Sequence, residues 1–250
     1  MRPVSEAFRQ DGFAFPLRAF SADRAAGYRA QLESSERAPE LDDQVVRDQF
    51  YRGQAHLLLP IVAEIARAPA IVAAVTSVLG PDVLLWLSSL FIKEPGTSDF
   101  VGWHQDLHYW GLDGTDEVTA WVALTAATTE NGCMRFVAGS HRSGVEHVET
   151  GNPENMLSRQ QEVAVEVDEA EATEVVLQAG EFSLHHGNLF HASNPNVSGD
   201  RRIGLALRYI TPELRQAGVD SPCAMLISGE DTAGRYRLVN GPQVAFDPAA

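Results

Sequence analysis

Two segments far apart in the chain carry histidines that could bind one metal ion. The first contains His104-Gln105-Asp106, and the second runs from residue 185 to His191. Side chains alternate along an extended strand, so His104 and Asp106 would share one face of it and could bind the same cation. If the fold places His191 opposite them, two histidines and one carboxylate occupy one face of an octahedral ion. Three positions then stay open, as in non-haem iron oxygenases.

The spacing His-x-Asp has little specificity alone, because it also occurs as an ordinary hydrogen-bonded surface pair. A second feature supports the metal hypothesis. Arg202 follows His191 by eleven residues and leads into an apolar run that ends at Tyr209. A guanidinium on a strand near a metal can bind a carboxylate through two parallel hydrogen bonds. The two features together predict a metal site with a neighbouring carboxylate-binding site.

The elements that must position these residues are mainly short strands. Apolar and β-branched runs, separated by turn residues, predict strands at 83–87, 90–92, 118–124, 134–137, 174–177, 182–184 and 203–209. Many short strands of this kind are typical of a double-sheet jelly roll with helices packed outside it. We therefore expect a mainly β fold with flanking helices and a double-stranded β-helix (jelly-roll, cupin-like) core.

Helices are predicted mainly in the first eighty residues. Ser21 can cap a helix that carries Ala25, Tyr28 and Leu32 on one side. Pro69 is suited to the first position of a second helix, which Gly80 then ends. No repeat or linker divides the chain, so we expect one domain over 1–250: a helical part (about 1–80), the jelly-roll core (about 82–210) and a C-terminal tail (211–250).

An acidic stretch of weak periodicity occupies residues 141–173. It could be a solvated surface excursion or a flap over the site, and the sequence does not decide between them.

Composition limits the partners. The formal net charge of −15 and the pI near 4.8 argue against nucleic-acid binding and against anionic membranes. The same charge gives no steering toward a polyanionic substrate, although one local basic pocket would overrule this. Two cysteines make no disulfide framework, and no run of residues reaches the length of a membrane span, so we expect a cytoplasmic protein.

Three ordered blocks resemble the phytanoyl-CoA dioxygenase family, a branch of the iron(II)/2-oxoglutarate oxygenases. They are His104-Gln105-Asp106-Leu107-His108-Tyr109, the run from Asn131-Gly132 to Ser140-His141, and His191-Ala192-Ser193-Asn194-Pro195 followed by Arg202. The resemblance covers residues from about 82 to 210, while the N-terminal third is similar only in its helical character.

The resemblance implies a role for each matched position. His104, Asp106 and His191 would bind Fe(II). Arg202, helped by Ser193, would hold the distal carboxylate of 2-oxoglutarate, Trp121 would line the co-substrate pocket, and Lys93 matches a basic position beside it. Related halogenases replace the ligating carboxylate with Ala or Gly so that chloride can bind; because Asp106 is present, hydroxylation is favoured here.

Other residues have weaker signals. Arg135 could clamp an anionic substrate group or form an ordinary salt bridge, and we favour the clamp. His108 and Tyr109 could contact the substrate, and Arg52 and His56 could border the mouth of the site. His186 matches a family position near the metal without being a ligand, and packing is its expected role. Adjacent residues on a strand point to opposite faces, so His185 points away from its neighbour and is assigned no role.

The function expected from these observations is a 2-oxoglutarate-dependent dioxygenase. With Fe(II), 2-oxoglutarate and O2 it would hydroxylate an unactivated C–H of a small-molecule metabolite or natural-product intermediate and release succinate and CO2. Desaturation, cyclisation or epimerisation by the same oxidising chemistry stays open, as does a non-catalytic metal-binding jelly-roll protein. The co-substrate arginine argues against the binding protein. The substrate and the oligomeric state are left open.

Overall fold

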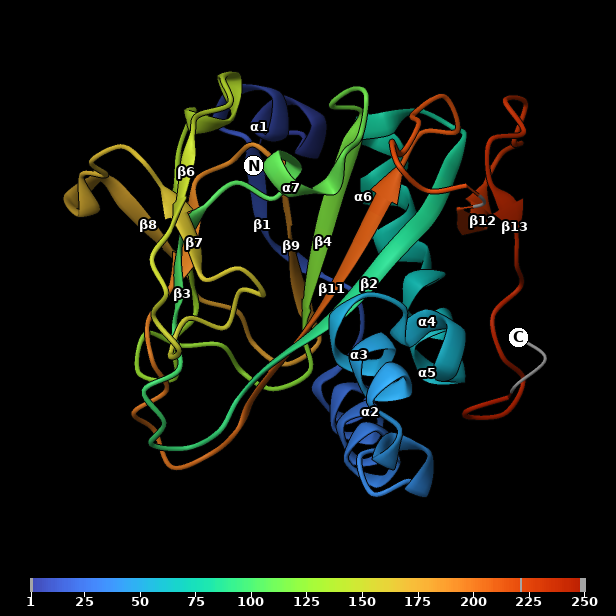
Figure 1. Cartoon of the computed structure of the whole chain (residues 1–250), viewed down its shortest axis with the longest axis horizontal. Coiled ribbons are helices and arrows are strands. Elements are labelled where there is room, and N and C mark those ends of the chain that lie inside the picture. The colour runs from blue at the N-terminus through green and yellow to red at the C-terminus, as the bar shows by residue number, and fades with distance from the viewer. Residues whose placement is uncertain (1, 221, 248–250) are drawn as a thin grey trace.

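The structure is a computed structural model that describes residues 2–220 and 222–247. Two β-sheets form its centre, and helices cover the outer face of the larger one (Figure 1). The seven-stranded sheet has the order β1-β9-β4-β11-β2-β12-β13, and the four-stranded sheet has the order β3-β10-β5-β8. The mainly β, jelly-roll prediction is therefore confirmed.

The strands of the large sheet come from both ends of the chain. They are β1 (Phe13–Arg18), β2 (Val83–Lys93), β4 (Glu117–Ala123), β9 (Glu181–His185), β11 (Arg202–Ile210), β12 (Cys223–Ser228) and β13 (Arg237–Leu238). The runs predicted separately at 83–87 and 90–92 form the single strand β2. The expected helical part contributes β1, and the expected tail contributes β12, which pairs with β2. Neither strand could be recognised alone, because pairing with β9 and β2 supplies the hydrogen bonds that define them.

The smaller sheets and short elements complete the β part. The small sheet consists of β3 (Val101–His104), β5 (Met134–Val137), β8 (Ala172–Val175) and β10 (His191–Ser193). The acidic stretch forms its own ribbon of β6 (His147–Glu149) and β7 (Gln161–Val163), flanked by the turns η2 (Ser140–Arg142) and η3 (Glu169–Glu171).

Seven α-helices are present in the described residues, and two of them have ends at the predicted signals. They are α1 (Val4–Asp11), α2 (Ala22–Ser35), α3 (Gln44–Arg52), α4 (Ala55–Leu58), α5 (Pro60–Ala66), α6 (Pro69–Leu79) and α7 (Leu107–Trp110), with the 3-10 turn η1 (Pro39–Asp42) after α2. Ser21 caps α2 by accepting a hydrogen bond from the Arg24 amide, and α6 begins at Pro69 and ends before Gly80. The sequence predicted both helices correctly.

Alternation along β4 and β11 separates two environments. Val118, Ala120 and Val122 on β4 pack with the helices in the main apolar core. Thr119 and Trp121 face the space between the sheets, where they line the pocket around the histidines. The large sheet therefore presents an apolar face to the helices and a partly polar face to the site.

The length and hydropathy of a helix decide whether it could cross a membrane. Among the described residues, no single helix is long and apolar enough to cross a membrane. The helices α5 and α6 meet the criterion only as a pair, and they are bent by 53° at the break between them.

Candidate metal and co-substrate site

Three potential metal ligands meet between the two sheets. His104 ends β3, His191 begins β10, and the two are direct partners in the antiparallel pairing of these strands. Asp106 follows the end of β3, and its carboxylate lies 3.4 Å from the His104 Nε2 atom and 3.9 Å from that of His191. One ligand atom from each residue lies within 4.8 Å of the others, and all three side chains are buried. The structure thus brings the predicted residues together.

The prediction that His104 and Asp106 share one face of an extended strand is wrong. The strand ends at His104, and Asp106 has helical backbone angles (φ −65°, ψ −45°) at the start of α7. The chain turns its carboxylate back toward the histidine instead of extending past it.

Each histidine ring is held so that Nε2 is free to bind a metal. The Nδ1 atom of His104 lies 2.9 Å from the Gly102 carbonyl oxygen, and that of His191 lies 2.9 Å from the Leu189 carbonyl oxygen. A carbonyl only accepts, so Nδ1 carries the proton and donates it in both rings, and the Nε2 lone pair points to the cluster. Burial, and then the nearby His104, lowers the pKa of His191 well below its usual value, which keeps this ring neutral.

Asp106 is held as a carboxylate. Burial alone would raise its pKa, but the charge of Arg208 and then the two neighbouring histidines outweigh burial and hold the pKa well below its usual range. Two neutral imidazoles and one carboxylate fit a divalent iron ion on one octahedral face.

A buried arginine, with a lysine beside it, lies next to the metal cluster. Arg202 is 1% exposed and lines the same pocket, its Nη1 donates to the Gly132 carbonyl at 3.0 Å, and its Nε and Nη2 have no hydrogen-bond partner among the described residues. Its guanidinium carbon lies 5.3 Å from the centre of the Trp121 ring. Burial lowers the pKa of Arg202 only to about 10, so it stays charged at neutral pH.

Lys93 lies directly opposite Arg202 in the pairing of β2 with β11. Its fully buried Nζ donates to the Ser193 hydroxyl at 2.8 Å and to the Ser193 and Asn194 carbonyls. Burial, and then the charge of Arg202, lowers the pKa of Lys93 to about 6. Among the described residues neither side chain has a hydrogen-bonded carboxylate partner, and the charged Arg202, with two free N–H donors, fits one end of a dicarboxylate.

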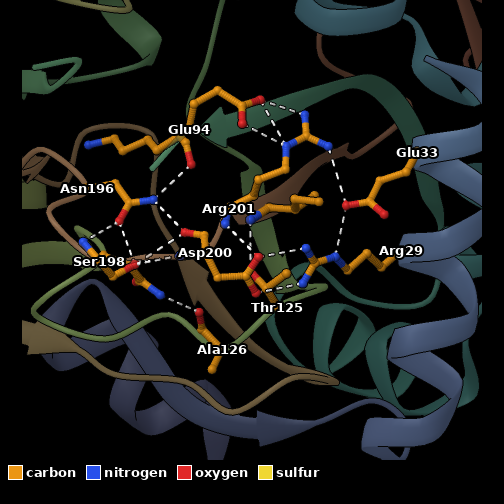
Figure 2. Close-up of polar contacts among 12 residues, drawn as sticks. Arg29, Glu33, Glu94, Thr125, Ala126, Asn196, Ser198, Asp200 and Arg201 are labelled. Atoms are coloured by element: carbon orange, nitrogen blue, oxygen red, sulfur yellow. Dashed lines mark hydrogen bonds and ion pairs between the residues drawn. The ribbon is translucent and has the colours of Figure 1, made fainter. Parts of the chain in front are cut away.

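Arg201 and Arg202 are neighbours in sequence but lie in different surroundings. Arg201 does not line the metal pocket, and it pairs with Glu94 at 2.7 Å and with Glu36 at 2.8 Å. Figure 2 shows this network continuing to Arg29, which binds the Asp200 carboxylate through two 2.8 Å hydrogen bonds. These ion pairs tie the loop before β11 to α2, and of the two neighbouring arginines Arg202 is the one that lines the metal pocket.

Several residues with weaker sequence signals lie elsewhere. Arg135 donates to Glu169 at 2.8 Å, packs over Trp103 and lines neither the metal pocket nor the cleft beside it, so the structure shows the salt bridge, and the clamp stays a prediction that this arrangement does not favour. His56 does not border the mouth: it is fully buried, with Nδ1 2.8 Å from the Ser88 hydroxyl.

His108 packs against His147 and does not line the cleft beside the metal pocket, whereas Tyr109 and Arg52 do line that cleft.

The positions of His185 and His186 are exchanged relative to the prediction. His185 is buried, lines the metal pocket and lies 4.8 Å from the His191 ring centre, whereas His186 packs beside Phe8 on α1. Sequence reasoning missed His185 because alternation fixes that neighbours differ, but not which of them faces inward.

A cleft of about 680 Å³ adjoins the metal pocket. Its wall includes five residues of the acidic stretch: Met156, Leu157, Ser158, Arg159 and Gln161. This stretch therefore borders the site, as the flap hypothesis requires. Phe91, Asp106 and Arg208 line both the cleft and the metal pocket.

A double-sheet β core that holds two histidines and one carboxylate at one point defines the non-haem iron oxygenase class. The model of the Phytanoyl-CoA dioxygenase (PhyH) family matches residues 8–204, and the chain belongs to that family. It is therefore an oxidoreductase of the 2-oxoglutarate-dependent dioxygenase class, as the sequence predicted.

Individual relatives give the range of similarity. The chain is 29% identical to a Stutzerimonas stutzeri protein named "Probable alpha-ketoglutarate-dependent hypophosphite dioxygenase", over 71% of this chain and 64% of that one. It is 25% identical to an ectoine dioxygenase of Nocardia farcinica, over 82% and 76% of the two chains. Among solved structures, the non-heme monooxygenase ThoJ in its apo form is 36% identical, with a TM-score of 0.88 over 98% of this chain and 91% of that one.

Proposed function

We propose that this protein binds Fe(II) through His104, Asp106 and His191 and uses 2-oxoglutarate and O2 to hydroxylate a C–H bond of a small organic molecule. The observation that carries the proposal is the pairing of two sites in one pocket. A metal-ligand cluster with its Nε2 atoms free lies beside a buried arginine with two unpartnered N–H donors. A structural metal site has no need of the second feature, which argues for an enzyme over a metal-binding protein.

The bound iron and co-substrate supply the oxidising chemistry, in which 2-oxoglutarate is converted to succinate and CO2. The chain supplies geometry. Arg202, Lys93 and the Ser193 hydroxyl hold the distal carboxylate, and the face of Trp121 keeps the guanidinium in place. The buried pocket excludes water from the reacting centre, which strengthens each charged contact made there.

The substrate enters through the cleft. Relatives named for ectoine, proline and hypophosphite support a small molecule as the substrate class. We infer the cytoplasm as the compartment, which the two unpaired cysteines support.

The test is succinate release by the purified full chain with Fe(II), 2-oxoglutarate and O2, alone and with a panel of metabolites. We expect release to require all three and to increase with the true substrate. Mass spectrometry of the product then separates hydroxylation, which adds one oxygen, from desaturation or cyclisation, which removes hydrogen, and from epimerisation, which leaves the mass unchanged. Iron binding without any succinate would leave the non-catalytic binder as the better description.

A further inference from the structure

The cleft beside the metal pocket has an apolar wall and one buried cation, Arg208. Its lining also includes charged side chains that are not buried: Glu36, Arg52, Glu94, Asp99, Arg159 and Arg201. The apolar part comes largely from β2, α7 and the acidic stretch: Leu87, Leu90, Phe91, Trp110, Met156 and Leu157. Arg208 lies where the cleft meets the metal pocket, and it is 6% exposed. A ligand that fills the cleft and reaches the metal must therefore pass the Arg208 guanidinium.

The Arg208 side chain is held rigidly in this position. Its Nη1 donates to the Ser89 hydroxyl at 2.8 Å, and that hydroxyl donates in turn to the Arg52 carbonyl at 2.8 Å. The guanidinium carbon lies 5.0 Å from the centre of the Trp110 ring. Because its orientation is fixed by a hydrogen bond and by an aromatic face, Arg208 loses little further freedom when it binds an anion.

No described residue makes a hydrogen-bonded ion pair with Arg208. Its Nε has no partner, and the nearest carboxylate oxygen, on Asp106, is 3.9 Å away. The charge of Asp106 is also committed to the metal cluster. Glu117 is buried close by, but burial raises its pKa well above the usual value, which leaves it neutral. A buried guanidinium without a bound anion is unfavourable, so the missing anion is expected from a ligand.

Arg208 and Arg202 face different parts of the site. They are six residues apart on β11, which is on the order of 20 Å along the strand. Arg202 lines the metal pocket alone, beside Lys93 and Ser193, whereas Arg208 also lines the cleft. The first arginine suits the co-substrate, and the second suits a molecule that enters by the cleft.

We propose that Arg208 binds a carboxylate group of the substrate and thereby selects which of its C–H bonds lies next to the metal. This inference rests on the proposed function and adds the substrate class: an organic acid with an apolar or aromatic body. The planar guanidinium accepts a carboxylate through two parallel hydrogen bonds, and the aromatic and aliphatic wall of the cleft packs against the rest of the molecule.

The experiment compares benzoate with benzamide, which match in shape and differ in charge. Each is titrated by ligand-observed NMR, without oxygen, into the full chain loaded with Fe(II) and saturating 2-oxoglutarate. We expect the wild-type protein to bind benzoate at least about tenfold more tightly than benzamide. Arg208→Gln should remove this preference, and Arg208→Lys should keep only part of it, because lysine retains the charge without the planar fork. Arg18→Gln, which removes a surface arginine, should retain the wild-type preference.

Binding of 2-oxoglutarate to each iron-loaded protein is measured first and serves as the folding control. We expect Arg208→Gln to change that affinity by less than about twofold, in contrast to Arg202→Gln. Equal binding of benzoate and benzamide by the wild type, or a preference that survives Arg208→Gln, would overturn the inference. Loss of 2-oxoglutarate affinity in Arg208→Gln would assign this arginine to the co-substrate and also overturn it. Wild-type protein that fails to bind 2-oxoglutarate would instead refute the proposed function itself.

Discussion

Replacing Arg202 by alanine gives the sharpest test of the co-substrate site. In the free protein this side chain makes one hydrogen bond, to the Gly132 carbonyl, and leaves Nε and Nη2 without partners. Two free donors in a planar fork match one carboxylate. Charge-assisted hydrogen bonds contribute about 1.5–3 kcal/mol, so Arg202→Ala should weaken 2-oxoglutarate binding by roughly one to two decades.

Two features of the site set where in this range the result should fall. The charge of Arg202 contributes to lowering the pKa of Lys93, so its removal lets Lys93 become protonated more easily and replace part of the lost attraction. Without the guanidinium, the face of Trp121 loses its contact and the carboxylate loses its planar partner, and Lys93 replaces neither. Because Lys93 does replace part of the charge attraction, we expect the loss of 2-oxoglutarate affinity to lie nearer to one decade than to two.

The assay is anaerobic calorimetry of 2-oxoglutarate with iron-loaded protein. Iron affinity should barely change, because Arg202 contacts none of the three proposed ligands. Arg201→Ala is the matched control, since it removes a neighbouring arginine whose partners are Glu36 and Glu94 at the surface. An unchanged dissociation constant for Arg202→Ala, or an equal loss in Arg201→Ala, would refute this reading of the site.

Four further outcomes are expected. Alanine in place of His104, Asp106 or His191 should abolish both turnover and stoichiometric iron binding, which metal analysis measures. Full iron content in any one variant would mean that the residue is not a ligand. The pKa of Lys93 is about 6, and a bound carboxylate raises it, so Lys93 should take up a proton when 2-oxoglutarate binds at pH 7–8, and binding should tighten as the pH falls toward 6. Calorimetry in buffers of different ionisation enthalpy detects this proton uptake, and Lys93→Met should abolish it. A Cβ at Gly204 would lie 1.8 Å from Trp121 Cζ2, so Gly204→Ala should lower the free energy of unfolding by about 1–3 kcal/mol and weaken 2-oxoglutarate binding, whereas unchanged denaturation and affinity would show that the ring can move freely. With excess chloride and labelled O2, the wild type should give succinate with one labelled atom and no chlorinated product; either unlabelled succinate or a chlorine isotope pattern would contradict the role of Asp106.

The sequence alone determined the strands and helices that have strong local signals. Ser21, Pro69 and Gly80 fix helix ends through their own backbone and side-chain chemistry, so α2 and α6 were predicted correctly. The placement of Trp121 and Arg202 beside the co-substrate came from the family resemblance, and the structure puts both in the lining of the metal pocket. Elements with weak local preference, such as β1 and β12, are defined by the strands beside them.

The sequence also determined which residue types are available for chemistry and their approximate grouping. The sequence by itself identifies His104, Asp106, His191 and Arg202, because each belongs to a short motif that resembles the family pattern. The structure brings all four into one pocket. Only the tertiary structure, however, showed that Asp106 reaches the cluster by a turn into α7.

What tertiary structure alone decided was the direction and the partner of each individual side chain. Period-two alternation requires His185 and His186 to face opposite ways, but the pairing of β9 with β4 places His185 inward, opposite Thr119. Arg135 and Arg208 are equally cationic in the sequence, yet Glu169 on a distant turn neutralises the first, while no carboxylate in the described part of the chain comes within hydrogen-bonding distance of the second. Such choices depend on contacts between segments far apart in the chain, because burial and charge compensation are set by whichever group the fold brings alongside.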